Sequence, residues 1–244
     1  MPDMQAGPKS MSEISRLTSV FFDPKPVFAD LAAKPRWIVP VVIMIILGVA
    51  YLTAFSRRVG WESFMRQQIQ TSERMQQLPA EQQERVIEQQ IKFAPIMGYA
   101  GVVLGVPVML LAIAGVLLGL FKMSASAELT FKQAFSLTAY ANMPSTLVSI
   151  LSLVVMFVKE PEDFDLQNPL AANLGAFLDP DTTSKVVQSL AASVDVFTLW
   201  IVILLATAFS TAIRRMTFGA ALARVIPAWV VWVVVKAGWA AMFG

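Results

Sequence analysis

The feature that most constrains this chain is the length of its uncharged apolar runs. A helix needs about 20 mainly apolar residues to cross the hydrocarbon core of a bilayer. Five segments reach roughly this length, at residues 37–56, 95–121, 134–158, 196–213 and 225–243. A soluble domain would divide its apolar residues into periodic faces, and it would carry about 25% charged residues. Since only 15% of this chain is charged, we predict an all-α, polytopic integral membrane protein with five transmembrane helices.

Residues 1–36 precede the five-helix membrane domain predicted for residues 37–244. Apolar side chains recur in this first segment at helical spacing, at Ile14, Leu17, Val20 and Phe21. A helix with one apolar face either lies in the membrane interface or docks on loops of its own chain. Both interpretations stay open from the sequence.

The long polar loop at residues 59–93 has a strongly helical composition. Pro79 precedes Glu81 and Glu84, and this order is typical of a helix start. The mixed charges of the loop favour a solvated helix over a partner-binding one.

The charges of the loops predict the orientation of the chain. Arg214, Arg215 and Arg224 lie around the fourth loop, and loops rich in arginine and lysine stay in the cytoplasm. The third loop, residues 159–193, is rich in acids and is expected outside. Five spans then place the amino terminus inside and the carboxyl terminus outside, although the arginines of the first loop oppose this assignment.

Composition argues against several classes of function. The chain contains neither histidine nor cysteine, which removes most catalytic and metal-binding constellations. The carboxylates lie almost entirely in loops, and no phosphate-binding glycine loop is present. Basic residues are scattered among acidic ones, unlike a nucleic-acid patch. We therefore expect no enzyme, no cofactor, no metal site and no nucleic-acid partner.

Small side chains follow one face of the second predicted span. Residues at intervals of four and three share a helix face, and here they allow another helix to approach closely. This small-residue stripe consists of Gly101, Gly105, Ala112, Gly115 and Gly119. It predicts close helix packing.

The third predicted span carries a polar stripe at the same spacing. Its residues are Thr138, Asn142, Ser145, Ser149 and Ser152. Pro144 interrupts this helix and removes the donor for the carbonyl of Tyr140, which Asn142 or a water could replace. The stripe either packs against other helices through backbone hydrogen bonds or lines a polar cavity for a solute or lipid headgroup.

Two ionisable residues lie within or beside the last two spans. Asp195 opens the fourth span, where a carboxylate complements the positive end of the helix dipole. Lys236 lies within the fifth span, where an unpaired lysine costs about 2.5–3.5 kcal/mol. We predict a structural ion pair between Asp195 and Lys236.

The order of several short motifs resembles the Yip family, five-span membrane proteins named for interaction with Ypt and Rab GTPases. The resemblance covers nearly the whole chain and is closest to the bacterial branch. It depends on Phe22, Pro24, Phe28, Pro35, Trp37 and Pro40, on Tyr140, Ala141, Asn142 and Pro144, and on Asp195, Phe197 and Trp200. The polar loop at residues 78–93 also resembles bacterial members.

The resemblance implies an inside amino terminus, the inner membrane of a bacterium, and function by partner binding without chemistry. A bacterium lacks Rab machinery, so the trafficking role of eukaryotic members is not carried over. The small-residue stripe and the resemblance favour a scaffold or adaptor that binds membrane lipids and other membrane proteins or a second copy. The alternative is a small permease, channel or lipid-handling protein that uses the polar stripe.

Overall fold

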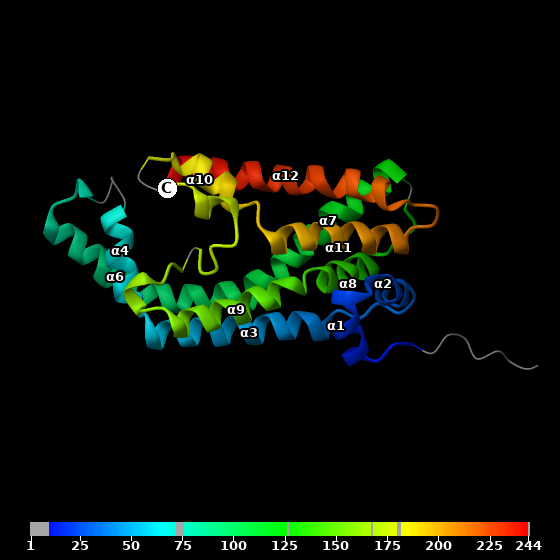
Figure 1. Ribbon diagram of the computed structural model, residues 1–244, viewed down its shortest axis with the longest axis horizontal. Helices are drawn as coiled ribbons and strands as arrows, with labels where there is room; N and C mark the ends of the chain where they lie inside the picture. Colours follow the sequence, from blue (N-terminus) through cyan, green and yellow to red (C-terminus); the bar gives the residue numbers. More distant parts are fainter. Residues whose placement is uncertain (1–9, 72–75, 126, 167, 180–181, 244) are drawn as a thin grey trace, which may run out of the picture. The chain divides into compact units, whose positions relative to one another are not determined.

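The structure is a computed structural model that describes residues 10–71, 76–125, 127–166, 168–179 and 182–243. Within these ranges the elements are helices, apart from one isolated β-bridge between Asn173 and Asp195. The α-helices are α1 (Glu13–Phe22), α2 (Pro24–Ala33), α3 (Ile38–Arg58), α4 (Trp61–Thr71), α6 (Ala80–Ala100), α7 (Val106–Ala125), α8 (Phe131–Ala141), α9 (Pro144–Val158), α10 (Lys185–Ala192), α11 (Val196–Ala212) and α12 (Phe218–Phe243) (Figure 1). Shorter turns are η1 (Gly101–Gly105), η2 (Pro161–Asp163) and η3 (Leu174–Phe177). The predicted all-α class is confirmed.

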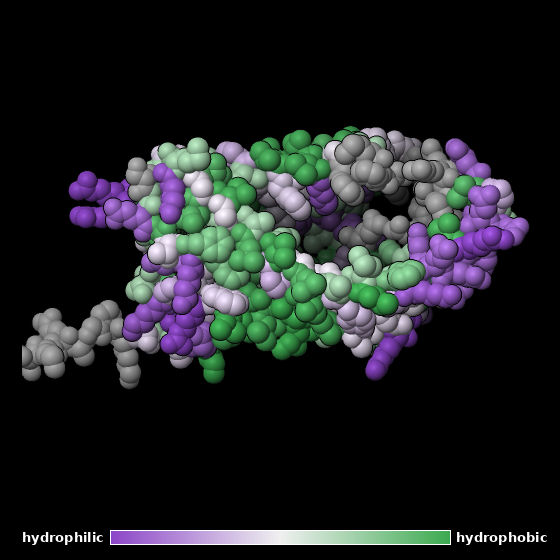
Figure 2. Space-filling model, turned by 180° about the vertical axis from the view of Figure 1, so that it is seen from behind, coloured by the Kyte–Doolittle hydropathy of each residue, from purple (hydrophilic) through white to green (hydrophobic). Residues whose placement is uncertain are grey.

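Four helical segments are long and apolar enough to cross a membrane. They are Ile38–Arg58, Ala80–Ala125, Phe131–Val158 and Phe218–Gly238, and between 17% and 39% of their apolar windows is buried inside the protein. Such helices turn most of their side chains outward, as a lipid solvent requires. Figure 2 accordingly shows broad hydrophobic areas on the visible surface. The fourth predicted span, α11, has 17 residues and is therefore at the short limit of about 17–25 for a crossing helix.

The second predicted span belongs to a continuous helical segment from Ala80 to Ala125. Its first part, α6, begins directly after Pro79, which confirms the predicted start. A π-helical turn, η1, separates α6 from α7 just before Pro107. Because π-turns and prolines are the usual places where long helices change direction, this segment has a local cause for a kink.

The third predicted span is divided into two helices, α8 and α9, at Asn142 and Met143. The backbone N–H of Met143 donates to the carbonyl of Tyr140 at 3.1 Å. The sequence offers Asn142 or a water as the partner of this carbonyl; the backbone of Met143 takes this place, and the Asn142 side-chain amide donates to the carbonyl of Thr138 at 2.8 Å. The turn is tight enough for a backbone N–H to replace the hydrogen bond to the Tyr140 carbonyl that Pro144 cannot donate.

The chain divides into two compact units. Unit 1 comprises Met1–Val42, Leu110–Pro144 and Trp200–Trp229. Unit 2 comprises Ile43–Met109, Ser145–Leu199 and Val230–Gly244. Each unit has a core of its own.

In unit 1, the short helices α1 and α2 pack on each other and on α8 (Figure 1). Helix α8 begins with a capping box between Thr130 and Gln133, and the Gln133 amide also donates to the carbonyl of Ala32 at 2.6 Å. This carbonyl lies in the last turn of α2, where carbonyls lack helical partners. The beginning of α8 and the end of α2 are thus joined through Gln133. Buried apolar side chains complete the core, among them Val20, Val27, Phe28, Leu31, Leu137 and the stacked rings of Phe121 and Phe209.

In unit 2, the core centres on Phe55, Met156 and Phe164, which are buried. The rings of Trp61 and Phe64 from α4 meet the Phe55 ring edge-on, with centroids 5.1 Å and 5.8 Å away. This aromatic group anchors the polar first loop to α3. The loop itself forms a hairpin of α4 and α6.

The hairpin is joined by exposed charges. Arg66 on α4 contacts both carboxylate oxygens of Glu84 on α6, at 2.8 Å and 3.2 Å. Exposed pairs of this kind stabilise a fold by only about 0–1 kcal/mol, so the aromatic contacts with Phe55 hold the loop. The predicted helical character of this loop is confirmed.

Helix α3 lies close to the η1 turn at Gly48. A Cβ atom at Gly48 would lie 2.7 Å from Cγ1 of Val102, whereas a Cβ at Gly119 meets no atom within 4 Å. Val102 is β-branched and cannot easily turn away inside a helix.

We expect Gly48→Ala to lower the free energy of unfolding by about 1–3 kcal/mol relative to Gly119→Ala, because overpacking is costly. Both changes gain the same helix propensity of up to about 1 kcal/mol, so their difference isolates the steric effect. Thermal unfolding of both variants in one detergent checks this. Equal shifts in the two variants would show that α3 yields at Gly48 without strain.

Candidate functional site

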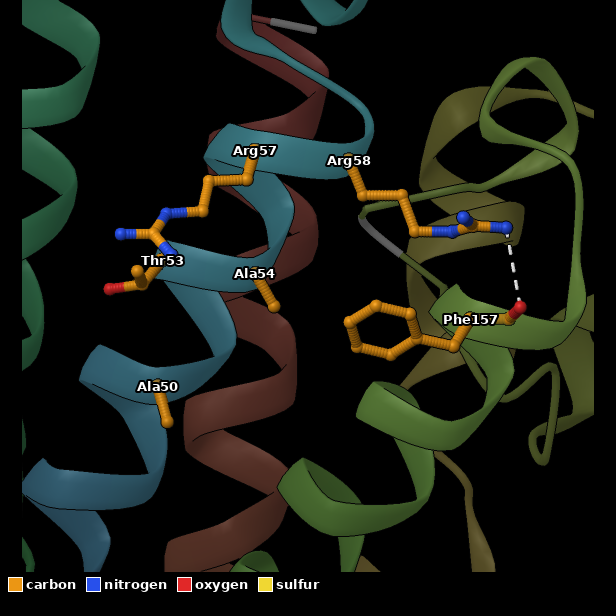
Figure 3. A pocket seen from close by; sticks show the side chains of 6 residues that line it. All are labelled: Ala50, Thr53, Ala54, Arg57, Arg58 and Phe157. Carbon is orange, nitrogen blue, oxygen red and sulfur yellow. Dashed lines mark hydrogen bonds between the residues drawn. The ribbon is translucent and has the colours of Figure 1, made fainter.

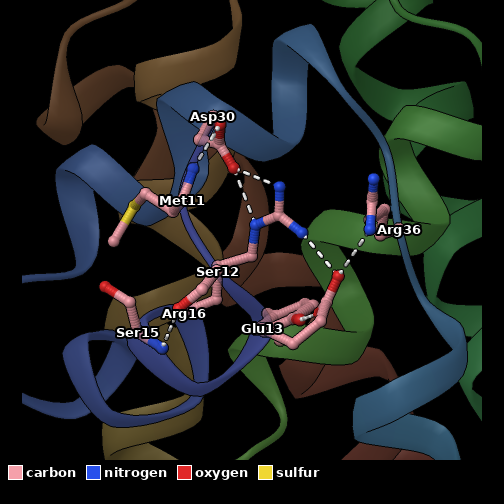
Figure 4. Close-up of polar contacts among 8 residues, drawn as sticks. Met11, Ser12, Glu13, Ser15, Arg16, Asp30 and Arg36 are labelled. Carbon is pink, nitrogen blue, oxygen red and sulfur yellow. Dashed lines mark hydrogen bonds and ion pairs between the residues drawn. The ribbon is translucent and has the colours of Figure 1, made fainter. Parts of the chain in front are cut away.

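A buried network of charged side chains lies at the amino-terminal end of unit 1. The side chain of Arg16 on α1 is only 1% exposed. Its Nε and Nη2 atoms lie 2.7 Å and 2.5 Å from Oδ2 of Asp30 on α2. Its Nη1 atom lies 2.7 Å from Oε1 of Glu13. Figure 4 shows the guanidinium between the two carboxylates. We name Glu13, Arg16, Asp30 and Tyr140 the amino-terminal network.

The fourth member connects the network to the membrane helices. The hydroxyl of Tyr140, a buried residue of α8, donates to Oε2 of Glu13 at 2.6 Å. At the other end of α1, the Phe21 ring meets the ring of Trp200 on α11, with centroids 5.7 Å apart. Two of the residues that carry the family resemblance, Tyr140 and Trp200, therefore hold α1 in place.

The charge balance of the network explains why a guanidinium is tolerated inside the protein. Burial on its own lowers the pKa of Arg16, but the hydrogen bond and charge of Asp30, with the charge of Glu13, outweigh burial and raise the pKa. Arg16 therefore stays charged. A buried ion pair adds little net stability over apolar packing, but losing one partner is costly. The network thus fixes where α1 docks.

Helix α1 buries a charged residue beside an apolar one, which sequence periodicity did not predict. Ile14 and Phe22 are 75% and 89% exposed, whereas Arg16 and Val20 are buried. The contacts favour the interpretation in which the segment docks on its own chain. The exposed Ile14 and Phe22 leave contact with the membrane interface as a proposal. Glu13, Arg16 and Asp30 were missed because the apolar spacing dominated the sequence signal; the Glu13–Arg16 spacing was the available hint.

The small-residue stripe has open space in front of it. A Cβ atom added at Gly101, Gly105 or Gly119 meets no atom within 4 Å, and one at Gly115 would only touch Phe131 at 3.9 Å. Ala112 is exposed. The close internal approaches occur at other glycines, Gly48 and Gly98. The stripe is therefore not used for packing by the described part of this chain.

The polar stripe is distributed over α8, the turn and α9. Asn142 donates to the Thr138 carbonyl, and the Ser149 hydroxyl donates to the Ser145 carbonyl at 3.2 Å. The hydroxyls of Thr138 and Ser152 are buried and have no hydrogen-bond partner among the described residues. Asn142 and Ser149 bond to backbone of their own segment, which supports the structural interpretation of the stripe.

Asp195 and Lys236 do not form a direct ion pair among the described salt bridges. The Asp195 carboxylate caps α11 instead, accepting from the N–H groups of Phe197 and Thr198 at 2.9 Å each and from the Thr198 hydroxyl. Lys236 donates to the hydroxyl of Ser193 at 3.3 Å. Capping satisfies the first N–H groups of α11, which have no helical partners, so it competes with the ion pair for the carboxylate.

Two further residues of the resemblance, Pro144 and Phe197, have local roles. Pro144 opens α9 directly after the turn. The N–H of Phe197 is one of the two that Asp195 caps. Within the part of the chain that the structure describes, no group of three or more acidic side chains is placed to hold a metal ion.

The amino-terminal network yields a prediction about stability. Arg16→Met leaves the Asp30 carboxylate without its guanidinium, and breaking a buried pair costs about 3–5 kcal/mol. Arg36→Met is the matched control, because Arg36 contacts the same Glu13 oxygen at 3.3 Å with a side chain that is 61% exposed. We expect the control to cost less than about 1 kcal/mol. Thermal unfolding and protease cleavage of the α1–α2 segment measure both, and similar losses in the two variants would contradict a special role for Arg16.

The geometry described above can be compared with known protein families. No curated protein and no solved structure matches the chain. The family model described as the Yip1 domain matches residues 18–242, a range that includes Asp30, Tyr140 and Trp200 and covers most of both units. The chain is therefore an integral, multi-pass membrane protein that belongs to the Yip1 domain family.

Proposed function

We propose that this protein is a non-enzymatic membrane scaffold or adaptor that binds another membrane protein, or a second copy of itself, through the small-residue stripe. The observation that carries the proposal is the open space in front of Gly101, Gly105 and Gly119. Lipid tails are as apolar as leucine, so helices associate in membranes by close packing of small residues. A glycine face that the chain leaves open is suited to a helix from another molecule.

The comparison with internal packing strengthens this proposal. Where this protein brings its own helices close together, it does so at glycines whose missing Cβ is needed, as at Gly48 and Gly98. The glycines of the stripe are therefore not explained by internal packing. A glycine inside a helix destabilises the helix by roughly 0.5–1 kcal/mol relative to alanine. A partner helix that needs the space of the missing side chain would explain why glycine is present here.

The permease alternative has less support. Two side chains of the polar stripe bond to backbone within their own segment. The groove found in unit 2 is lined by Ala50, Thr53, Ala54, Arg57, Arg58 and Phe157, none of which belongs to the stripe.

The charges of unit 1 support an amino terminus inside the cytoplasm. Exposed acids in this unit are few, with Asp23 and Glu128 as examples. Cationic side chains outnumber them in the segments around the ends of its helices: Lys25, Lys34, Arg36, Lys122, Lys132, Arg214, Arg215 and Arg224. Segments of this kind stay in the cytoplasm. We propose the same orientation, in the inner membrane of a bacterium.

Substitutions at Gly119 test the adaptor role. We expect Gly119→Leu to abolish association while the protein still folds, because a Cβ atom at this position meets no atom of its own chain within 4 Å and a bulky side chain holds a partner backbone away. Gly119→Ala should keep association, since alanine is still small. Crosslinking in native membranes followed by quantitative mass spectrometry measures loss of partners, and energy transfer between labelled copies in vesicles measures self-association.

Leu120→Phe is the control for bulk, because Leu120 is 37% exposed on a different side of α7. It should leave association unchanged. The adaptor proposal fails if Gly119→Leu unfolds the protein, or if it folds and retains every contact that the unmodified chain makes.

A reporter that is active only outside the cytoplasm tests the orientation. We expect activity when it is fused after Gly244 and none when it is fused before Met1. The cationic segments of unit 1 stay in the cytoplasm, and the amino terminus belongs to this unit. Activity of the amino-terminal fusion would reverse the assignment.

A further inference from the structure

Unit 2 contains a groove beside the polar end of α3. Its volume is about 740 Å³, within the range of about 300–1,000 Å³ for small-molecule sites. Ala50, Thr53, Ala54, Arg57 and Arg58 of α3 form one wall, and Phe157 of α9 faces them. Figure 3 shows the Phe157 ring pointing toward Ala54, while Arg57 and Arg58 leave α3 on opposite sides above it. The groove thus has a cationic rim and an apolar floor.

One of the two rim cations has a structural task. The Arg58 guanidinium donates to the carbonyls of Met156, Phe157 and Lys159, at 2.6 Å, 3.2 Å and 3.0 Å. These carbonyls lie at the end of α9, where helical partners are missing. Neutral carbonyls accept hydrogen bonds without cancelling charge. Arg58 therefore fixes the shape of the groove and leaves a positive charge at its rim.

The other rim cation is Arg57. Arg57 is exposed, and among the described residues its side chain makes no hydrogen bond or ion pair. The nearby Thr53 hydroxyl donates to the Val49 carbonyl at 2.7 Å, so its single hydrogen is already used. The donors open to a ligand are thus those of the Arg57 guanidinium, whose planar fork matches two oxygens of a phosphate.

We propose that this groove binds an anionic phospholipid. The phosphate contacts Arg57, and an acyl chain lies along Ala50, Ala54 and Phe157. The six lining residues include two arginines and no acid. A zwitterionic lipid would bring an ammonium group to this rim without a carboxylate to receive it, so a headgroup with net negative charge is the better match.

The membrane setting of the groove agrees with this ligand. Helix α3 is an apolar span that ends at the two arginines. Cations at the end of a span lie at headgroup depth, with hydrocarbon beside the preceding turns. The ligand is thereby presented in the orientation that the groove requires. The inference concerns unit 2 and does not depend on the adaptor role of the small-residue stripe.

Lipid binding to the purified full chain tests the proposal. Native mass spectrometry in detergent compares dioleoyl phosphatidylglycerol, dioleoyl phosphatidylcholine and glycerol phosphate as the headgroup alone. We expect phosphatidylglycerol to bind most tightly. Arg57→Gln should weaken its binding about tenfold or more, because charge-assisted hydrogen bonds to phosphate are lost. Ala50→Phe should weaken it comparably by filling the apolar floor, with Arg57 unchanged.

Arg214→Gln is the matched control, since Arg214 is an exposed arginine of unit 1 with no hydrogen bond or ion pair among the described residues. Phosphatidylglycerol binding should survive this change, and unfolding temperatures confirm that every variant is folded. Equal binding of both lipids overturns the proposal, as does equal loss in Arg214→Gln, which would indicate general charge attraction. If glycerol phosphate binds as tightly as the lipid and Ala50→Phe has no effect, the site takes a free phosphate and the lipid proposal is wrong.

Discussion

The absence of water in the bilayer core is the constraint on which this architecture depends. Each backbone N–H and C=O at membrane depth needs a partner within the protein, and a helix supplies nearly all of them within one segment. The interruption between α8 and α9 shows how closely the chain keeps to this rule. Pro144 brings no N–H, yet Met143 donates to the Tyr140 carbonyl and the Asn142 amide to the Thr138 carbonyl. A helix can therefore end and restart there without exposing an unpaired group to lipid.

Charged groups meet the same constraint in different ways. Arg16 is buried between two carboxylates, whose charges and hydrogen bonds offset the cost of removing the guanidinium from water. Among the described residues Arg58 contacts no carboxylate, and its guanidinium donates to three carbonyls at the end of α9. Arg57, one residue away, is exposed and makes no hydrogen bond or ion pair among the described residues. The difference between neighbours separates a cation that builds the protein from one that is available to a ligand.

Packing makes a similar distinction among glycines. Gly48 is necessary because Val102 occupies the space that a side chain would need. Gly119 lies in a similar helix with nothing in front of it. Both glycines belong to helices and both reduce helix stability. Each is therefore explained by the neighbour that uses the space of its missing side chain. For Gly48 this is another part of the chain, and for Gly119 we propose another molecule.

The amino-acid sequence by itself determined the class of this protein. Runs of apolar residues require a lipid solvent whatever they pack against, so the helical spans, the start of α6 after Pro79 and the membership of the Yip1 domain family could be predicted. The positions of side chains could not. Periodicity showed an apolar face on this segment, but the tertiary structure also buried Arg16, because Asp30 brings it a carboxylate from α2 and Tyr140 of α8 holds the Glu13 carboxylate beside it. Asp195 likewise caps its own helix, while Lys236 finds Ser193. Hydrophobic length is a property of one segment, whereas a partner for a charge depends on which segments meet, and only the tertiary structure decided that.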